Sequence, residues 1–267
     1  MIQRISVLLF VILAWVNSAF AAAVPQVEAE AAVVMAVNGR QVLFSKQADA
    51  IMYPASTTKI VTLITALEQG NPGSTVVVSS QAAACDGSSL DLRAGDKLTL
   101  QEALYGMMLV SGNDAAEAIA ENVAGSVPAF VKLMNNKAEK IGATRTNFSN
   151  PHGLPDPINH YTTAYDLALI TAYGMQNPVF ARIVSTRDYD VHFLNRPSTH
   201  ARNTNKLLAT FTGANGVKTG YTEAAGDCLV AAANRKGVEL IAVVLNSDQR
   251  WDDAARLLDY GFQQMGL

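Results

Sequence analysis

The chain has 267 residues, of which 49% are hydrophobic and 16% are charged, and its formal net charge is −3. This composition is typical of a globular protein with one large domain or two closely packed ones. The mildly acidic charge, without clusters of lysine and arginine, argues against a nucleic-acid partner.

The first 23 residues differ from the rest. Residues 1–4 are short and basic, residues 5–16 are almost entirely apolar, and residues 17–23 (NSAFAAA) contain small residues in an A-x-A pattern. This order is typical of a secretory signal peptide, so we expect residues 1–21 to be removed, with cleavage possible up to residue 23. The apolar segment is shorter than the roughly 20 residues of a membrane-spanning helix, which makes an uncleaved anchor the less favoured alternative. We expect an exported protein, periplasmic or extracellular, soluble and without a permanent membrane anchor.

The first half of the chain predicts one hairpin followed by helices. Two apolar runs in residues 31–49 join at Asn38-Gly39, a strong hairpin signal. Apolar residues at 60, 61, 63, 64 and 67 have helical spacing, and Thr99-Leu-Gln-Glu102 has the pattern of a capping box. We expect a proline-rich loop and helices over these ranges: loop 150–160; helices 56–69, 99–110, 114–123, 128–141 and 163–173.

From Gly216 onward the pattern changes to strands. The runs GVKTGYT, GDCLVAAANRKG and VELIAVVLN are apolar stretches separated by turn residues, which indicates an antiparallel meander. RWDDAARLLDYGF then predicts an amphipathic helix. Because strands at both chain ends flank a block of helices, we predict an α+β fold. Its antiparallel sheet is assembled from both ends of the chain, with an inserted helical part at about residues 56–175.

Cys85 and Cys228 lie 143 residues apart. An exported protein can form a disulfide, but the spacing does not show whether the two thiols meet, and we expect two small buried side chains instead. Neither cysteine lies in a C-x-x-C or H-x-x-x-H pattern, so we expect no metal site and no cofactor.

The segment YPASTTKIVTL (53–63) places Ser56 three residues before Lys59. Residues with this spacing share a helix face, so the lysine can reach the serine hydroxyl. The dipole at a helix N-terminus favours negative charge on the serine and disfavours a charged lysine, which suits a nucleophile beside a neutral base. Backbone N–H groups there can also form part of an oxyanion hole. The alternative, an N-cap serine with a solvated lysine, is the commoner case for this motif alone.

Two further motifs accompany this pair: Ser111-Gly-Asn113 between two predicted helices, and Lys218-Thr-Gly220 on the first strand of the meander. The three motifs resemble the S-x-x-K, S-D-N and K-T-G set of penicillin-binding proteins and β-lactamases. Longer segments, among them GSSLDLRAGDKLTLQEALYGMMLVSGNDAAEAIAE and TNFSNPHGLPD, are similar to the serine D-alanyl-D-alanine carboxypeptidases, the low-molecular-mass penicillin-binding proteins. The resemblance covers about residues 30–262 and implies a β-lactamase/transpeptidase-like fold.

The resemblance also implies roles for the first two motifs. Ser56 would be acylated with Lys59 as its base, Ser111 would relay a proton to the leaving amine, and Asn113 would hold the peptide amide of the substrate. Taken alone, SGND is also a helix end, a turn and a helix start with Asp114 as a cap, and the two interpretations are compatible.

The third motif and an arginine complete the expected substrate site. Lys218 would supply positive charge near a substrate carboxylate, Thr219 a hydroxyl, and Gly220 room for the peptide to pair with the strand. An exposed hairpin lysine is the alternative for Lys218. A free carboxylate calls for a further cation; Arg250 has this place by resemblance, and Arg202 is a weaker candidate.

Two histidines, His152 and His160, invite a Ser-His interpretation, but no third partner is evident, so we expect both to be loop or cap residues. A β-lactamase of the class A type needs a glutamate that activates water. Between Ser111 and Lys218 the glutamates all lie in predicted helices, and none begins an E-x-x-L-N pattern: Glu117, Glu121 and Glu139.

We therefore expect a serine hydrolase of peptidoglycan biosynthesis and cell shape, which removes the C-terminal D-alanine from pentapeptide stems through an acyl-enzyme and is covalently inhibited by β-lactams such as penicillins. The alternatives are an endopeptidase that cleaves D-alanyl-meso-diaminopimelate cross-links, a β-lactamase, and a non-catalytic cell-wall binder. Many longer relatives carry a small β-domain and an amphipathic anchor after the catalytic domain, whereas this chain stops at Leu267. We expect residues 24–267 to form a single catalytic domain without a C-terminal β-domain.

Overall fold

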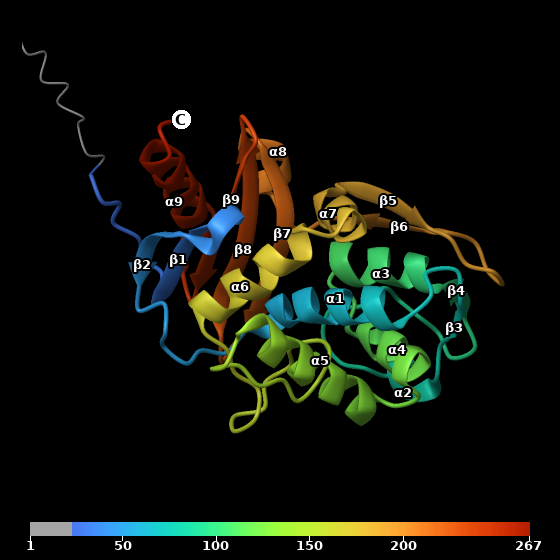
Figure 1. Ribbon diagram of the computed structural model, residues 1–267. Helices are drawn as coiled ribbons and strands as arrows, with labels where there is room; N and C mark the ends of the chain where they lie inside the picture. Colours follow the sequence, from blue (N-terminus) through green and yellow to red (C-terminus); the bar gives the residue numbers. More distant parts are fainter. Residues whose placement is uncertain (1–22) are drawn as a thin grey trace, which may run out of the picture.

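The computed structural model describes residues 23–267, and its centre is an antiparallel sheet (Figure 1). The strand order is β2-β1-β9-β8-β7, so strands from the two ends of the chain pair side by side. This confirms the predicted α+β fold with one sheet assembled from both ends. The five strands are β1 (Ala31–Ala36), β2 (Val42–Lys46), β7 (Ala214–Thr222), β8 (Gly226–Arg235) and β9 (Val238–Leu245).

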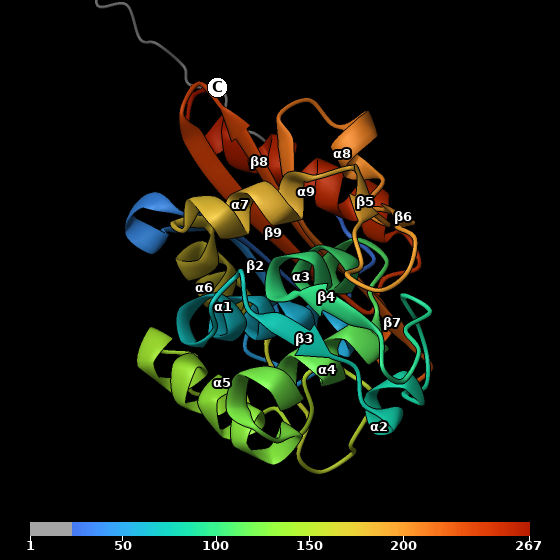
Figure 2. The ribbon, with the colours of Figure 1, turned by 90° about the vertical axis from the view of Figure 1, so that its right-hand side faces the viewer.

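Helices cover both faces of this sheet (Figures 1 and 2). On one face α6 packs on β1 and β9 and α7 packs on β7, and the other long helices of the middle of the chain lie beyond them; on the opposite face α9 packs on β8 and β9. The helices of eight or more residues are α1 (Lys59–Gln69), α3 (Leu100–Leu109), α4 (Asn113–Ala124), α5 (Val127–Ile141), α6 (Ala164–Met175), α7 (Pro178–Ser185) and α9 (Arg250–Gln264).

The central strands are buried on both faces, and this explains their continuous apolar sequences. In β1, Val33 faces the helical side of the sheet and Val34 faces α9; in β9, Val243 and Val244 divide in the same way. Successive side chains of a strand point to opposite faces, so each run contributes to two cores at once. The larger core lies under the helices and the smaller one under α9.

Several short elements were not predicted. Two two-stranded ribbons, β3 with β4 and β5 with β6, consist of strands of three or four residues, too short to show a clear period. The short elements are η1 (Asn38–Arg40), η2 (Ala55–Thr58), β3 (Thr75–Val77), α2 (Ser80–Ala83), β4 (Lys97–Thr99), β5 (Asp188–Val191), β6 (Thr199–Arg202) and α8 (Leu207–Thr210).

The predicted helix starts are largely observed. Thr99 and Thr163 accept hydrogen bonds from the backbone N–H groups three residues later, as N-caps do. The capping box at Thr99 is only half formed, because Glu102 accepts hydrogen bonds from Tyr189 Oη and His192 N instead. The helix predicted from residue 56 begins instead as the 3₁₀ turn η2, and its α-helical part starts at Lys59.

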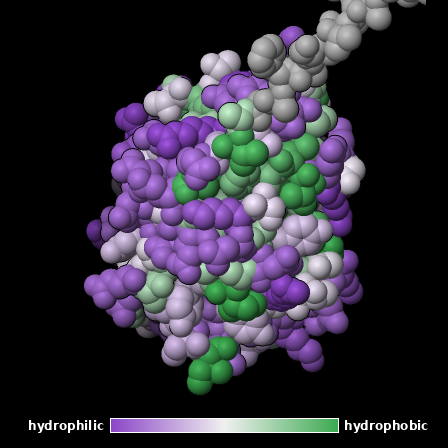
Figure 3. Space-filling model, turned by 90° about the vertical axis from the view of Figure 1, so that its left-hand side faces the viewer, coloured by the Kyte–Doolittle hydropathy of each residue, from purple (hydrophilic) through white to green (hydrophobic). Residues whose placement is uncertain are grey.

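The outer surface on the side of β2 and α9 mixes hydrophilic and hydrophobic side chains (Figure 3). Within residues 23–267 no helix is both long enough and apolar enough to span a bilayer. The predicted signal peptide, residues 1–21, lies outside the described residues.

Candidate active site

Two glycines allow two backbone segments to pass on either side of η2, which carries Ser56. Ala55 has a positive φ of 47°, and its carbonyl lies so close to Gly153 (φ +99°) that a side chain at 153 would overlap it. On the other side, a Cβ on Gly220 of β7 would stand 3.1 Å from the backbone nitrogen of Ser56. The loop around residue 153 and the edge strand β7 therefore hold the serine between them.

Lys59 is completely buried and lies beside Ser56. Its Nζ is 3.0 Å from Ser56 Oγ and donates to Asn113 Oδ1 at 2.6 Å and to the His152 carbonyl at 2.8 Å. Burial, with a smaller contribution from the charge of Lys218, holds the pKa of Lys59 well below its usual value. A neutral amine has two N–H groups and one lone pair, so the two carbonyl oxygens can accept its hydrogens while the lone pair faces the serine hydroxyl.

Asn113 is fixed at both ends of its amide. Its Oδ1 accepts from Lys59, and its Nδ2 donates to the backbone carbonyl of Asp86 at 2.6 Å. Ser111, two residues earlier, is 6% exposed and has a φ of 65°. A non-glycine residue in this region costs about 1–3 kcal/mol and tends to occur at functional sites, so the strain at Ser111 points to a functional constraint.

Asp114, the residue after Asn113, holds the start of α4 in place through its hydrogen bonds. Its carboxylate is buried and accepts hydrogen bonds from the backbone nitrogens of Leu90 and Leu92, at 3.0 Å each, and from Ser89 Oγ at 2.6 Å. The N-cap of α4 is Gly112, so the prediction of Asp114 as the cap is wrong. Asp114 instead ties the segment before α3 to the start of α4.

Lys218 lies on β7, the edge strand of the sheet next to η2. It is 1% exposed, and its Nζ donates to the carbonyl of Thr219 at 3.0 Å, so the alternative of an exposed hairpin lysine is wrong. Burial, and secondarily the charge of Arg250, lowers the pKa of Lys218 to about 7. The hydroxyl of Thr219 lies 2.6 Å from that of Thr204.

A cavity of about 220 Å³ opens at this point. It brings together five of the residues singled out from the sequence and three others. These three were missed because nothing in their local sequence distinguishes them. The lining residues are Ser56, Ser111, Thr219, Gly220 and Arg250, with Ser88, Thr204 and Tyr221 in addition. A larger cavity of about 410 Å³, between α1, α6 and α7, has Glu68 and Tyr173 in its wall but no nucleophile paired with a base.

The two candidate arginines lie in different places. Arg250 lines the cavity of Ser56; its Nη1 donates to the carbonyl of Gly220 at 2.9 Å and pairs with Asp227 at 3.0 Å. Arg202 is exposed on β6 and lines another cavity. Only Arg250 of these two faces the serine.

The two histidines bond to residues other than the serine. Nε2 of His152 lies 3.0 Å from Glu117 Oε1, and Nε2 of His160 lies 2.8 Å from Thr58 Oγ1. Burial lowers the pKa of both imidazoles, that of His160 to about 4. Both side chains are buried, and it is the backbone carbonyl of His152 that meets the lysine.

Both cysteines are free, so the disulfide alternative is wrong. Cys228 is buried as expected, whereas Cys85 is only half-buried. Burial raises the pKa of each thiol to about 11.

Comparison with known proteins agrees with this geometry. The sequence model of a family described as D-alanyl-D-alanine carboxypeptidase matches residues 18–249. The chain is 35% identical to the D-alanyl-D-alanine carboxypeptidase DacF of Bacillus subtilis over 89% of its own length and 63% of that protein's length. It is also 35% identical to DacB2 of Mycobacterium tuberculosis, over 90% of this chain and 84% of the relative.

Solved structures give the same result. The DD-transpeptidase of Streptomyces K15 superposes with a TM-score of 0.85 at 33% identity, covering 90% of this chain and 98% of that one. A D-alanyl-D-alanine carboxypeptidase from Mycobacterium tuberculosis gives a TM-score of 0.86 at 33% identity over 92% and 95% of the two chains. Because the family model and these relatives match most of its length, this chain belongs to the D-alanyl-D-alanine carboxypeptidase family of serine peptidases.

Proposed function

We propose that this chain is an exported serine carboxypeptidase that removes the terminal D-alanine from peptidoglycan stem peptides through an acyl-enzyme on Ser56. The observation that carries the proposal is the buried Lys59 amine, 3.0 Å from Ser56 Oγ, with carbonyl oxygens placed to accept its two hydrogens. The chain spans 63% of the length of DacF, so the activity for which that relative is named is carried over here as a proposal.

The chemistry follows from the groups in place. The lone pair of Lys59 takes the hydroxyl proton of Ser56 as Oγ attacks the carbonyl carbon between the two D-alanines. The backbone N–H of Ser56, at the start of η2 and α1, faces developing negative charge on the carbonyl oxygen. Ser111 lines the same cavity and relays a proton to the leaving amine, and water then releases the shortened peptide from Oγ.

Substrate binding uses the edge of the sheet. β7 ends the strand order, so one side of it can pair with an extended peptide, and Gly220 lets η2 approach this strand so closely that the peptide would lie beside Ser56. Asn113 holds a peptide amide, and Arg250, which lines the cavity, supplies positive charge for the C-terminal carboxylate. The buried Lys218 adds positive charge from β7 when it is protonated, below its pKa of about 7. Thr219 adds a hydroxyl in the same cavity.

The main alternatives differ in what the acyl-enzyme or the cavity accepts. An endopeptidase would take a cross-linked stem. A transpeptidase, the activity for which the Streptomyces enzyme is named, would pass the acyl group to an amine. A β-lactamase would need a carboxylate beside the acyl group, but Glu117 is bonded to His152 and is not among the residues that line the cavity. A non-catalytic binder would not need the Ser56–Lys59 pair at all.

The decisive experiment is incubation of the purified protein with a muramyl pentapeptide, alone and with an amine acceptor, and separately with penicillin. We expect free D-alanine from the pentapeptide and a penicilloyl adduct on the tryptic peptide that contains Ser56, with Ser56→Ala giving neither. A cleaved cross-link would favour the endopeptidase and a ligated product the transpeptidase. Folded protein without any adduct, or with one on another residue, would contradict the mechanism.

The fate of the adduct distinguishes the β-lactamase. The leaving group of a penicillin stays tethered and can block water, whereas released D-alanine diffuses away. We therefore expect the penicilloyl-enzyme to deacylate much more slowly than the peptidyl-enzyme in single-turnover measurements. Comparable rates would favour the β-lactamase.

A further inference from the structure

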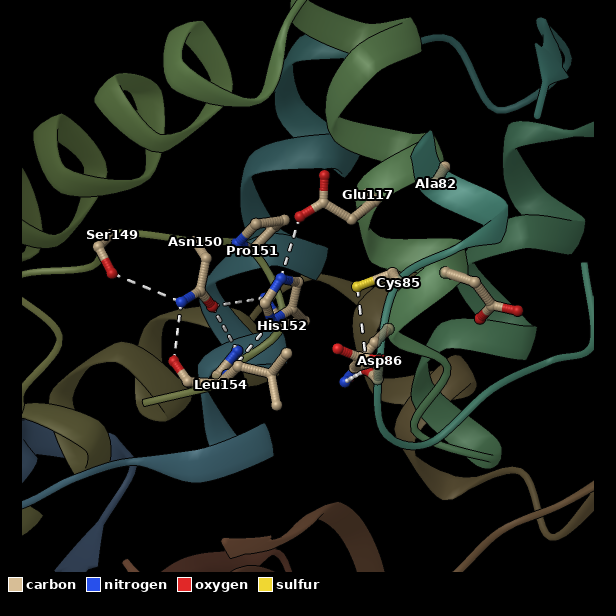
Figure 4. A network of polar contacts seen from close by, with 12 residues as sticks. Ala82, Cys85, Asp86, Glu117, Ser149, Asn150, Pro151, His152 and Leu154 are labelled. Atoms are coloured by element: carbon tan, nitrogen blue, oxygen red, sulfur yellow. Dashed lines mark hydrogen bonds and ion pairs between the residues drawn. The ribbon is translucent and has the colours of Figure 1, made fainter. Parts of the chain in front are cut away.

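Three metal-binding side chains converge next to the active site: Cys85, Glu117 and His152 (Figure 4). One donor atom from each, a thiol sulfur, a carboxylate oxygen and an imidazole nitrogen, lies within 4.8 Å of the other two. They come from three separate parts of the chain: the turn after α2, the middle of α4, and the loop between α5 and α6. The catalytic proposal uses none of these three side chains.

We propose that Cys85, Glu117 and His152 bind one divalent cation of the zinc class, with water in the fourth position, and that its binding slows acylation of Ser56. A mixed sulfur, nitrogen and oxygen set suits zinc, whereas magnesium and calcium take oxygen ligands. Metal–ligand distances of about 2.0–2.3 Å in a tetrahedron place neighbouring donors roughly 3.3–3.8 Å apart, so the widest separation has to close by about 1 Å.

The surroundings fit a cation that enters from solvent. Glu117 and His152 are buried, while Cys85 is half-buried and gives the site an open side. The charges also match, because a coordinated thiol is deprotonated outright and a thiolate with a carboxylate neutralises a dication. Glu117 Oε1 and His152 Nε2 are hydrogen-bonded at 3.0 Å, so this pair has to open by only about 0.3 Å to reach the separation of two ligands of one ion.

The coupling to the active site follows from the hydrogen bonds of His152. Its Nδ1 accepts from the backbone N–H of Leu154 at 3.2 Å, so the hydrogen of the neutral ring is on Nε2, which faces Glu117. A metal on Nε2 moves that hydrogen to Nδ1, where it opposes the N–H of Leu154, and the loop must shift. The carbonyl of His152 is one of the two that accept from Lys59.

A second connection runs through Cys85. The residue that follows it, Asp86, accepts the hydrogen bond from Asn113 Nδ2 through its backbone carbonyl, and the Oδ1 of the same amide accepts from Lys59. Drawing Cys85 toward a metal therefore displaces the support of Asn113. Two of the three contacts of the Lys59 amine depend on segments that the metal would move, and this part of the inference rests on the proposed function.

The test of binding uses metal-free full-length protein titrated with Co²⁺ and Zn²⁺. We expect one equivalent of Co²⁺ to produce a thiolate-to-cobalt charge-transfer band. Cys85→Ser should lose this band and bind Zn²⁺ at least about 100-fold more weakly. The loss of a direct ligand should weaken binding more than the loss of an outer-shell partner, which costs about 10- to 100-fold in affinity. Cys228→Ser, which removes the other free thiol, is the matched control and should keep both properties. No band, or the same band in Cys85→Ser, would overturn the site.

A second variant and a second measurement distinguish metal binding from the acylation of Ser56. Glu117→Gln keeps the size of the side chain but loses an anionic ligand, and we expect at least about 10-fold weaker Zn²⁺ binding. Thermal unfolding of each metal-free variant checks that it is folded. Zn²⁺ should slow acylation by penicillin in the unmodified protein and not in Cys85→Ser; equal slowing in both would overturn the coupling. Failure of the metal-free protein to react with penicillin would refute the proposed function, while the Co²⁺ band would still report the metal site.

Discussion

Replacement of Lys59 by arginine tests whether this residue is a base or only a positive charge. Arginine keeps a charge but has no lone pair to accept the proton of Ser56 at working pH. General-base catalysis contributes about 100- to 10,000-fold, so we expect Lys59→Arg to lose that much in the rate of acylation, equivalent to about 3–5 kcal/mol in the activation free energy.

The structure suggests a matched partner for this variant. Lys59 is completely buried, so a guanidinium overpacks the site and costs about 1–3 kcal/mol of stability. Lys59→Met nearly keeps the volume but leaves the oxygens of Asn113 and His152 without their donor, at about 1–3 kcal/mol each. If Lys59 is the base, the two variants should lose similar activity; if only its charge matters, arginine should be much the better replacement.

The assay is the second-order rate of reaction with a fluorescent penicillin near neutral pH, with thermal unfolding measured on the same samples. A folded Lys59→Arg protein whose acylation rate stays within about tenfold of the unmodified protein would refute the assignment of Lys59 as base.

Three further predictions concern the groups around the cavity. Asp114→Ala leaves the buried N–H groups of Leu90 and Leu92 without acceptors, so we expect about 2–6 kcal/mol lower stability in urea unfolding, with Asp114→Asn less affected; equal losses would contradict this account. Burial lowers the pKa of Lys218 to about 7, so between about pH 7 and 10.5 the amine binds a proton in the unfolded chain more often than in the folded one. The unfolding free energy of the unmodified protein should therefore rise with pH across that range relative to that of Lys218→Met. A difference that does not change with pH would mean that the buried amine does not titrate there. Arg250→Gln should raise KM about 10- to 100-fold for peptides with a free C-terminal carboxylate and not for their C-terminal amides, and an equal effect on both would exclude a carboxylate contact.

Most of the long helices and strands could be predicted from local sequence patterns. The apolar runs of β8 and β9, the cap at Thr99 and the start of the helix at residue 163 depend on neighbours in sequence, and all were predicted from it. Helix α7 could have been found the same way, because Asn177 caps it and Pro178 is its first residue. The ribbons β3–β4 and β5–β6 could not, since strands of three or four residues are specified by their partners more than by a period.

The candidate active site was also predicted only in part from the sequence. The sequence by itself determined which residue types stand one helical turn apart at Ser56 and Lys59, and the resemblance of its motifs pointed to Ser111, Asn113 and Lys218. Only the tertiary structure decided that the Lys59 amine is completely buried between two carbonyl acceptors, because Asn113 and His152 reach it from 54 and 93 residues away.

The same holds for the cluster beside the site. Cys85, Glu117 and His152 have no metal-binding spacing, and the sequence predicted no metal there, yet the fold brings their donor atoms within 4.8 Å of one another. Spacing motifs detect ligands that one helix or turn holds together. Donors on three segments are brought together only by the packing of α4 against α2 and of the loop around residue 152 against Lys59, and that packing is a property of the folded chain.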